Sequence, residues 1–85
     1  MALQMSNDDL KYLIEEAKET IASEPCRKKY GSEGGLCIEN EWEPKLDRGR
    51  WYIYDKARRR YLRYSSLEEQ DIHTAIETIR KTVVK

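Results

Sequence analysis

The stretch from Arg48 to Tyr64 constrains the fold of this chain more than any other. It reads RGRWYIYDKARRRYLRY, and aromatic and β-branched residues dominate it as nowhere else in the sequence. Such residues favour β-strands because they pack well on a pleated, half-buried surface. Residues 55–60, all polar except Ala57, separate two runs of this kind. We therefore predict a β-hairpin here, forming the middle of a small sheet.

The pairing of this hairpin follows from its apolar residues. Side chains alternate between the two faces of a strand, and paired residues share a face. An even-numbered turn, either residues 56–57 or residues 55–58, keeps the apolar side chains on one face, which is what specifies a register. The predicted pairs are Tyr54 with Arg59, Tyr52 with Tyr61, and Arg50 with Arg63. One face then carries Trp51, Ile53, Leu62 and Tyr64. The other carries Arg50, Tyr52, Tyr54, Arg59, Tyr61 and Arg63.

Two amphipathic helices flank the predicted sheet. Ser6 can cap a helix over residues 7–23, in which apolar residues recur at helical spacing, and Pro25 ends it. Ser66 and Glu69 have the spacing of a capping box before a second apolar stripe, which predicts a helix over residues 67–83. Each helix can bury one face against the sheet.

The segment between the first helix and the hairpin is predicted to be a loop followed by a strand. Residues 25–35 contain three glycines and read as a connector. Residues 36–43, LCIENEWE, alternate and predict a strand, with a turn over residues 44–49. Pairing Glu43 with Arg50 would set Trp42 beside Trp51 on the core face. The same pairing would place three acids on the opposite face: Glu39, Glu41 and Glu43.

These elements predict an α+β fold in the order α-β-β-β-α. The two helices would pack on one face of a three-stranded antiparallel sheet and leave the other face open, as antiparallel sheets permit. At 85 residues the chain is expected to form a single domain, residues 1–85, with a flexible N-terminus over residues 1–6.

The formal net charge is zero, but the charge is unevenly distributed. The hairpin region is strongly basic, whereas the regions of the two helices are acidic. No secretory signal or membrane-spanning run is evident, so we expect a cytoplasmic protein without membrane contact. Cys26 and Cys37 are then expected to be free and to pack as small apolar residues. The alternative is a disulfide that closes a loop of about 12 residues.

No enzyme, cofactor or metal motif stands out, and we predict a protein that is not an enzyme. Gly31, Gly34 and Gly35 lack the Gly-Lys-Ser/Thr ending of a phosphate loop. Glu43-Pro44-Lys45 has the Glu-x-Lys form seen in metal-dependent nucleases, with Glu39 and Glu41 as further carboxylates, but a carboxylate on a neighbouring strand is missing. Cysteine and histidine could supply three zinc ligands, Cys26, Cys37 and His73, but their spacing matches no structural zinc site.

The Tyr/Arg face is the strongest functional signal. Aromatic side chains stack on bases and arginines pair with phosphates, so we expect binding of DNA or RNA first. The alternative is a protein partner, with this chain acting as a regulator or inhibitor of phage or plasmid type or as a homodimeric adaptor, since Tyr and Arg anchor protein interfaces. The predicted binding residues are Arg50, Tyr52, Tyr54, Arg58, Arg59, Arg60, Tyr61 and Arg63.

Two resemblances in outline accompany this prediction. The order helix, three strands, helix resembles the double-stranded-RNA-binding domain, although Glu68, Glu69 and Asp71 stand where that family has basic residues. The stretch from Leu36 to Val84 is similar in outline to the arm-site domains of phage integrases, through its GRW, YD and RRRY segments. That similarity implies a sheet face laid in the major groove of DNA.

Overall fold

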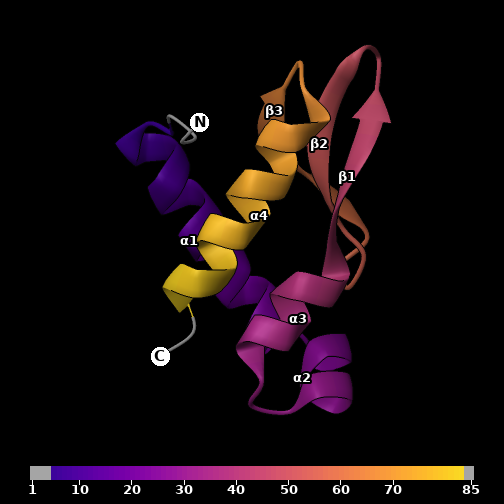
Figure 1. Ribbon diagram of the computed structural model, residues 1–85. Coiled ribbons are helices and arrows are strands. Elements are labelled where there is room, and N and C mark those ends of the chain that lie inside the picture. The colour runs from indigo at the N-terminus through magenta and orange to yellow at the C-terminus, as the bar shows by residue number, and fades with distance from the viewer. Residues whose placement is uncertain (1–4, 84–85) are drawn as a thin grey trace.

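A computed structural model describes residues 5–83 and confirms the α+β class. A three-stranded antiparallel sheet in the order β1-β2-β3 is accompanied by four helices (Figure 1). The helices are α1 Asn7–Ala22, α2 Glu24–Tyr30, α3 Gly34–Glu41 and α4 Glu69–Val83. The strands are β1 Trp42–Asp47, β2 Arg50–Asp55 and β3 Arg60–Ser66. Residues 1–4 of the N-terminus expected to be flexible lie outside the described residues.

The predicted hairpin is present as β2 and β3, joined by a turn over residues 56–59. Tyr54 pairs with Tyr61, not with Arg59, so the predicted register was wrong by two residues. A shift of two leaves Tyr54 and Tyr61 on their predicted face, because the side-chain period of a strand is two. Farther along, an irregularity between Tyr52 and Tyr54 brings Tyr52 opposite Ser65.

The predicted strand over residues 36–43 was wrong, because most of this segment belongs to helix α3. The helix buries Cys37 and Ile38. The next buried residue, Trp42, lies four positions after Ile38, and a spacing of four fits a helix as well as a strand. Gly34 begins the helix and lies against α1, where a Cβ atom would come within 3.0 Å of the Ile21 side chain. A short apolar run fits either period, and tertiary packing decides here in favour of the helix.

Strand β1 therefore begins at Trp42, and the predicted turn over residues 44–49 shrinks to Arg48 and Gly49. Both turn residues have positive φ, 53° and 80°, as two-residue hairpin turns of type I′ require. Trp42 pairs with Asp55 rather than lying beside Trp51. Pro44 lies within β1, an edge strand of the sheet, where a missing N–H donor is tolerated.

The predicted loop over residues 25–35 was wrong over its first half, which forms helix α2. Pro25 lies in the first turn of α2, where its missing N–H donor costs nothing. Proline thus ends α1 at Ala22 and begins the next helix. Gly31, with φ at 61°, terminates α2 in a backbone conformation that L-residues rarely adopt.

The predicted helix starts are largely confirmed. The Ser6 side chain accepts a hydrogen bond from the Asp9 backbone N–H at the start of α1. Helix α4 begins at Glu69, two residues later than predicted. The Ser66 hydroxyl accepts the Glu68 N–H and donates to the Asp71 carboxylate, and so it still organises the start of the helix.

The core lies between the sheet and the pair α1 and α4, which cover one face of the sheet (Figure 1). Helix α4 packs against all three strands, and α3 adds Ile38 to the same cluster from the end of β1. The buried side chains of the cluster are Leu13, Ala17, Ile38, Trp42, Ile53, Leu62, Ile72, Ala75, Ile76 and Ile79. Within residues 5–83, no helix combines the length and the hydropathy that crossing a membrane requires.

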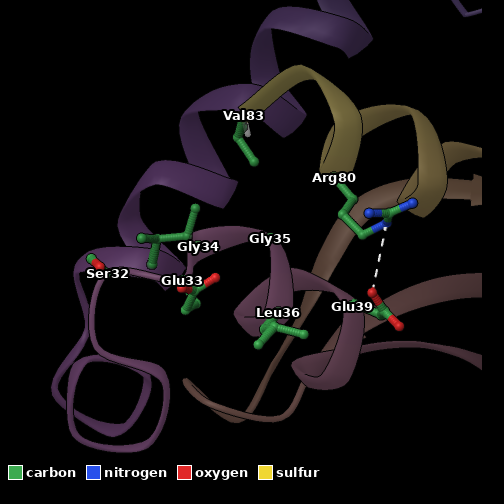
Figure 2. A pocket seen from close by; sticks show the side chains of 9 residues that line it. Ser32, Glu33, Gly34, Gly35, Leu36, Glu39, Arg80 and Val83 are labelled. Atoms are coloured by element: carbon green, nitrogen blue, oxygen red, sulfur yellow. Dashed lines mark ion pairs between the residues drawn. The ribbon is translucent and has the colours of Figure 1, made fainter. Parts of the chain in front are cut away.

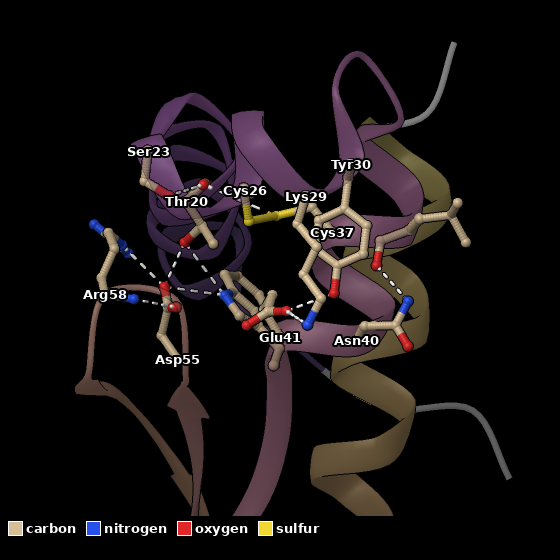
Figure 3. Close-up of a disulfide and its surroundings, with 12 residues drawn as sticks. Thr20, Ser23, Cys26, Lys29, Tyr30, Cys37, Asn40, Glu41, Asp55 and Arg58 are labelled. Atoms are coloured by element: carbon tan, nitrogen blue, oxygen red, sulfur yellow. Dashed lines mark hydrogen bonds and ion pairs between the residues drawn. A yellow bond between two sulfur atoms is a disulfide. The ribbon is translucent and has the colours of Figure 1, made fainter.

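The prediction of free cysteines was wrong, because Cys26 and Cys37 form a disulfide between α2 and α3 (Figure 3). Their sulfur atoms are buried, and the Cα atoms lie 5.8 Å apart. The Tyr30 hydroxyl also donates a hydrogen bond to Glu41, which ties the two helices together a second time. This hydrogen bond, with burial and the charge of Glu41, raises the pKa of Tyr30 to about 12. Helix α2, only seven residues long, is thus held by cross-links to α3.

Candidate binding surface

The open side of the sheet carries a cluster of tyrosines that we call the tyrosine face. By register it comprises Glu43, Lys45, Asp47, Arg50, Tyr52, Tyr54, Tyr61 and Ser65. The Tyr61 ring meets those of Tyr52 and Tyr54 edge-on, with centroids 5.9 and 5.0 Å apart. Tyr61 is 44% exposed. The apolar side of the predicted separation of faces is confirmed, since Trp42 and Ile53 lie in the core and Trp51 and Tyr64 pack against it.

Three cations accompany the tyrosine face. The Lys45 ammonium lies 5.1 Å from the centre of the Tyr54 ring, a cation–π contact. The Arg50 Nε atom donates to the Ser65 hydroxyl oxygen at 3.1 Å, which leaves its other guanidinium N–H groups free of bonds to described residues. Lys56, at the start of the β2–β3 turn, pairs with Glu43 at 3.8 Å.

Two of the glutamates expected on this face lie elsewhere. Glu39 and Glu41 belong to α3, because residues 36–41 are helical and not extended. Glu39 lies 3.9 Å from Arg80, and Glu41 is occupied by Tyr30 and Lys29. Of the three glutamates predicted there, only Glu43 stays on the tyrosine face, and Asp47, opposite Arg50 in the strand register, is its other acid.

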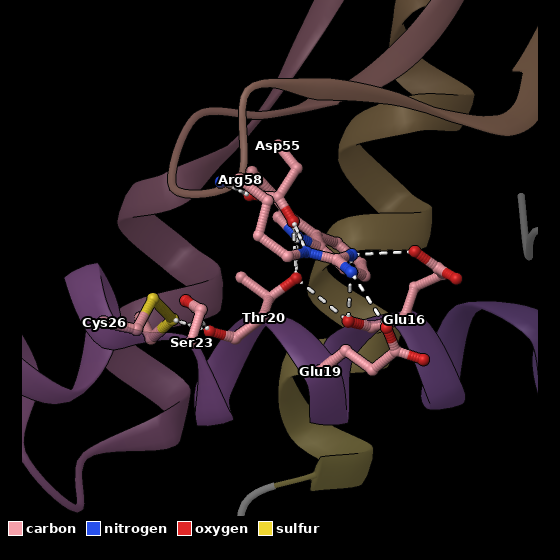
Figure 4. A network of polar contacts seen from close by, with 9 residues as sticks. Glu16, Glu19, Thr20, Ser23, Cys26, Asp55 and Arg58 are labelled. Atoms are coloured by element: carbon pink, nitrogen blue, oxygen red, sulfur yellow. Dashed lines mark hydrogen bonds and ion pairs between the residues drawn. A yellow bond between two sulfur atoms is a disulfide. The ribbon is translucent and has the colours of Figure 1, made fainter.

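Arg58, predicted as a binding residue at the tip of the hairpin, lies apart from the tyrosine face. Its guanidinium lies on the helix side, where it contacts Asp55 at 2.9 Å, Glu16 at 2.7 Å and Glu19 at 3.2 Å (Figure 4). Burial tends to lower the pKa of Arg58, but the hydrogen bonds to Glu16 and Asp55 raise it, and the net shift is upward. The side chain is 10% exposed, and its guanidinium is held by three carboxylates of the protein itself.

The Asp55 carboxylate at the centre of this network is completely buried. It accepts hydrogen bonds from the Thr20 hydroxyl, from the Trp42 indole N–H, and from the backbone and side chain of Arg58 (Figure 4). Both carboxylate oxygens therefore accept hydrogen bonds, three at Oδ2 and one at Oδ1, as a buried charge requires. The network is a structural link between the β2–β3 turn and α1.

Arg63 also leaves the tyrosine face. Its guanidinium lies 4.3 Å from the centre of the Tyr12 ring on α1, and its backbone N–H donates to the Tyr12 hydroxyl at 2.9 Å. The strand irregularity between Tyr61 and Ser65 accounts for this, because such bulges re-aim side chains. Regular alternation could not have predicted the position of Arg63.

Arg59 and Arg60 lie at the end of the tyrosine face, in the β2–β3 turn and at the start of β3. Both are exposed, and Arg59 has a φ of 58°. Arg60 pairs with Asp55 in the strand register, so alternation assigns it to the face opposite Tyr61, at the end of the sheet. Of the eight predicted binding residues, the structure gathers four on the face itself: Arg50, Tyr52, Tyr54 and Tyr61.

Cations without an ion pair concentrate on the sheet. Among the described residues, most ion pairs connect helical side chains, as with Lys18 and Glu15 or Arg80 and Glu77. The only described bases off the sheet that make no ion pair are Lys11 and Arg27. The sheet and its turns hold the rest of the unpaired set: Lys45, Arg48, Arg50, Arg59, Arg60 and Arg63. The basic character predicted for the hairpin thus survives folding as exposed positive charge.

A hollow lies beside the start of α3. It is bordered by Gly34, Gly35, Arg80 and Val83 (Figure 2). The glycines open a helix, contrary to the predicted strand, yet Arg80 already pairs with Glu39 and Glu77. Over residues 5–83 there is also no group of histidine, cysteine and acidic side chains arranged to hold a metal ion.

Two residues of the surface escaped prediction. Lys45 was assigned to a turn because β1 was placed too early in the sequence. Tyr12 was not singled out, because its contact with Arg63, 51 positions away, leaves no local signal. Its aromatic ring off the main apolar stripe of α1 was the one available hint.

The fold and this surface define a small α+β protein with an open, tyrosine-rich sheet face. No protein-family model matches the chain, and neither the curated proteins nor the solved structures contain a match to it.

Proposed function

We propose that this protein binds nucleic acid through the tyrosine face and the cations around it. The observation that carries the proposal is the concentration of unpaired, exposed cations on the sheet, next to three clustered tyrosines. Phosphate backbones attract such cations regardless of sequence. Tyrosine rings and hydroxyls contact bases and sugars, and a sheet can present both kinds of group together.

The arrangement of the cations supports this function. Arg48 and Arg50 stand at one end of β2, whereas Arg59 and Arg60 stand at the other. Residues 50 and 55 are separated by about 17 Å along the strand. Phosphates on either side of the tyrosines can therefore be contacted at the same time.

Fluorescence anisotropy tests the proposal with labelled strands of about 20 nucleotides, longer than the roughly 4–16 nucleotides that an OB-fold domain engages. DNA and RNA, each single-stranded and as a duplex, form the four arms. If about four phosphates are contacted, the Kd should rise about a hundredfold between about 50 and 200 mM salt. Failure to bind any of the four at the lowest salt would overturn the proposal.

Substitutions locate the surface. Arg50→Gln should weaken binding severalfold and reduce the salt dependence, whereas Arg27→Gln removes an unpaired cation from α2 and should leave both unchanged. Tyr52→Ala should cost about tenfold in affinity, within the range measured for lost aromatic contacts to bases. Equal losses for Arg50→Gln and Arg27→Gln would mean that only overall charge matters.

A protein partner is the competing function, and one observation favours it. The tyrosine rings pack against one another and beneath Lys45, in the manner of an anchor cluster at a protein interface. In that case binding of a partner would persist after nuclease treatment and would respond weakly to salt. Tyr52→Ala would then abolish it, while Arg50→Gln would have little effect.

A further inference from the structure

We infer that Arg63 and Tyr12 form a preorganised phosphate-binding clamp at the outer edge of β3, which extends the nucleic-acid surface beyond the tyrosine face. The inference rests on the proposed function and adds a contact that regular strand geometry would have placed elsewhere. Tyr12 acts in it as a positioning residue, and Arg63 makes the contact with the ligand.

The geometry of the pair supplies the first argument. The guanidinium of Arg63 lies 4.3 Å from the centre of the Tyr12 ring, while the Arg63 backbone N–H is bound by the Tyr12 hydroxyl. Both ends of the arginine are therefore held by the same side chain. An arginine on an aromatic ring keeps its N–H donors free at the edge of its plane, and these donors match two phosphate oxygens.

The second argument is that the arginine has no other task. Arg63 is exposed and makes no ion pair with any described residue. Arg58, by comparison, lies five positions earlier and is saturated by three carboxylates. Holding a long side chain in place before binding removes part of the entropy cost of ordering it in the complex.

The third argument is the position of the clamp. Tyr61 lies on the tyrosine face two residues before Arg63, and the irregular stretch that follows directs Arg63 toward α1. A nucleic acid that lies on the tyrosine face and crosses the β3 edge would thus bring its next phosphates to this arginine. The ligand of the clamp is a phosphodiester of the same bound strand.

The test is the salt dependence of the Kd for the same four labelled probes. Arg63→Gln should reduce the slope of log Kd against log salt by about 0.7–0.9, the amount expected for one phosphate contact. Tyr12→Ala should reduce the slope by the same amount, although Arg63 itself is unchanged. Tyr12→Phe should keep most of the wild-type slope, because the aromatic ring under the guanidinium remains. The double variant should lose no more than either single variant.

Arg27→Gln is the matched control, since it removes one unpaired cation from α2 and should leave the slope unchanged. Thermal unfolding of each variant verifies that the fold is retained. An unchanged slope in Arg63→Gln would overturn the clamp even if Tyr12→Ala proved too unstable to measure. Separate, additive losses from Tyr12→Ala and Arg63→Gln would also overturn it.

The wild-type result separates this inference from the proposed function. If the wild-type protein binds none of the probes, the proposed function is wrong and the clamp is wrong with it. If the wild type binds and Arg50→Gln weakens binding while Arg63→Gln does not, the tyrosine face stands and the clamp alone fails.

Discussion

At the scale of single residues, Asp55 is the most consequential side chain in the structure. It is an unexposed carboxylate near the end of an otherwise apolar core, and it links the β2–β3 turn to Thr20 on α1, 35 positions away. Trp42 reaches the same carboxylate with its indole N–H. A buried ion pair adds little net stability compared with an apolar replacement, but breaking one is costly because a charge is left without its partner.

Asp55→Asn should therefore lower the free energy of unfolding by about 3 kcal/mol. The amide is nearly the same shape, but it carries no charge to balance Arg58 and cannot accept at both of its positions. Urea unfolding followed by tryptophan fluorescence measures the change. Asp47→Asn, on the exposed end of β1, is the matched control and should change stability by no more than about 0.5 kcal/mol. If Asp55→Asn and Asp47→Asn had the same free energy of unfolding, the structural role of the network would be contradicted.

At the scale of elements, the hairpin and the two long helices could be predicted from sequence because each has a strong and unambiguous period. Apolar residues alternate through residues 50–55, and they recur at helical spacing through α1 and α4. Residues 36–41 form too short a segment for either period to dominate, and their helix depends on the disulfide and on packing against α1. That information lies in contacts between elements and not in the local sequence.

The candidate site divides in the same way. The tyrosines could be placed because alternation alone determines which face they occupy, and even a register error of two residues left them there. Arg58 and Arg63 could not be placed, because a buried network and a strand irregularity redirect them. Both arginines are held by residues of α1, which lie more than forty positions away in the sequence.

The β1–β2 turn yields a prediction at this scale. Arg48 has a φ of 53°, a conformation that costs most L-residues about 1 kcal/mol or more, whereas asparagine adopts it readily before glycine. Arg48→Asn should therefore stabilise the protein by up to about 1 kcal/mol, as measured by the midpoint of urea unfolding. Arg50→Asn, at an extended position two residues later, should not stabilise. A lower midpoint for Arg48→Asn would show that the arginine makes a contact that offsets the strain.

At the scale of the whole molecule, the disulfide joins helix α2 to the rest of the fold through α3. Helix α2 contributes little to the apolar core, since Cys26 is its one buried residue. On the chain-entropy model, closing a loop of about 12 residues stabilises by about 3 kcal/mol. A cytoplasmic location remains a prediction, and in a reducing compartment this contribution would be lost.

Cys26→Ser should therefore lower the free energy of unfolding by about 3 kcal/mol, and adding a thiol reductant to the wild-type protein should lower it by a similar amount. The reductant should have no further effect on the variant, which serves as its own control. Urea unfolding with and without reductant gives both values. A wild type whose stability is insensitive to reductant, with both thiols open to alkylation beforehand, would show that the cross-link does not form.

The proline in β1 has a consequence for behaviour at high concentration. An exposed edge strand presents unpaired backbone N–H and C=O groups, and other copies of the protein can pair with them to form fibrils. Pro44 interrupts this row of groups near its middle, and the charged side chains of Lys45 and Asp47 follow it. Concentrated solutions should consequently stay clear and free of thioflavin-binding material, whereas replacing Pro44 with valine would open a path to amyloid growth.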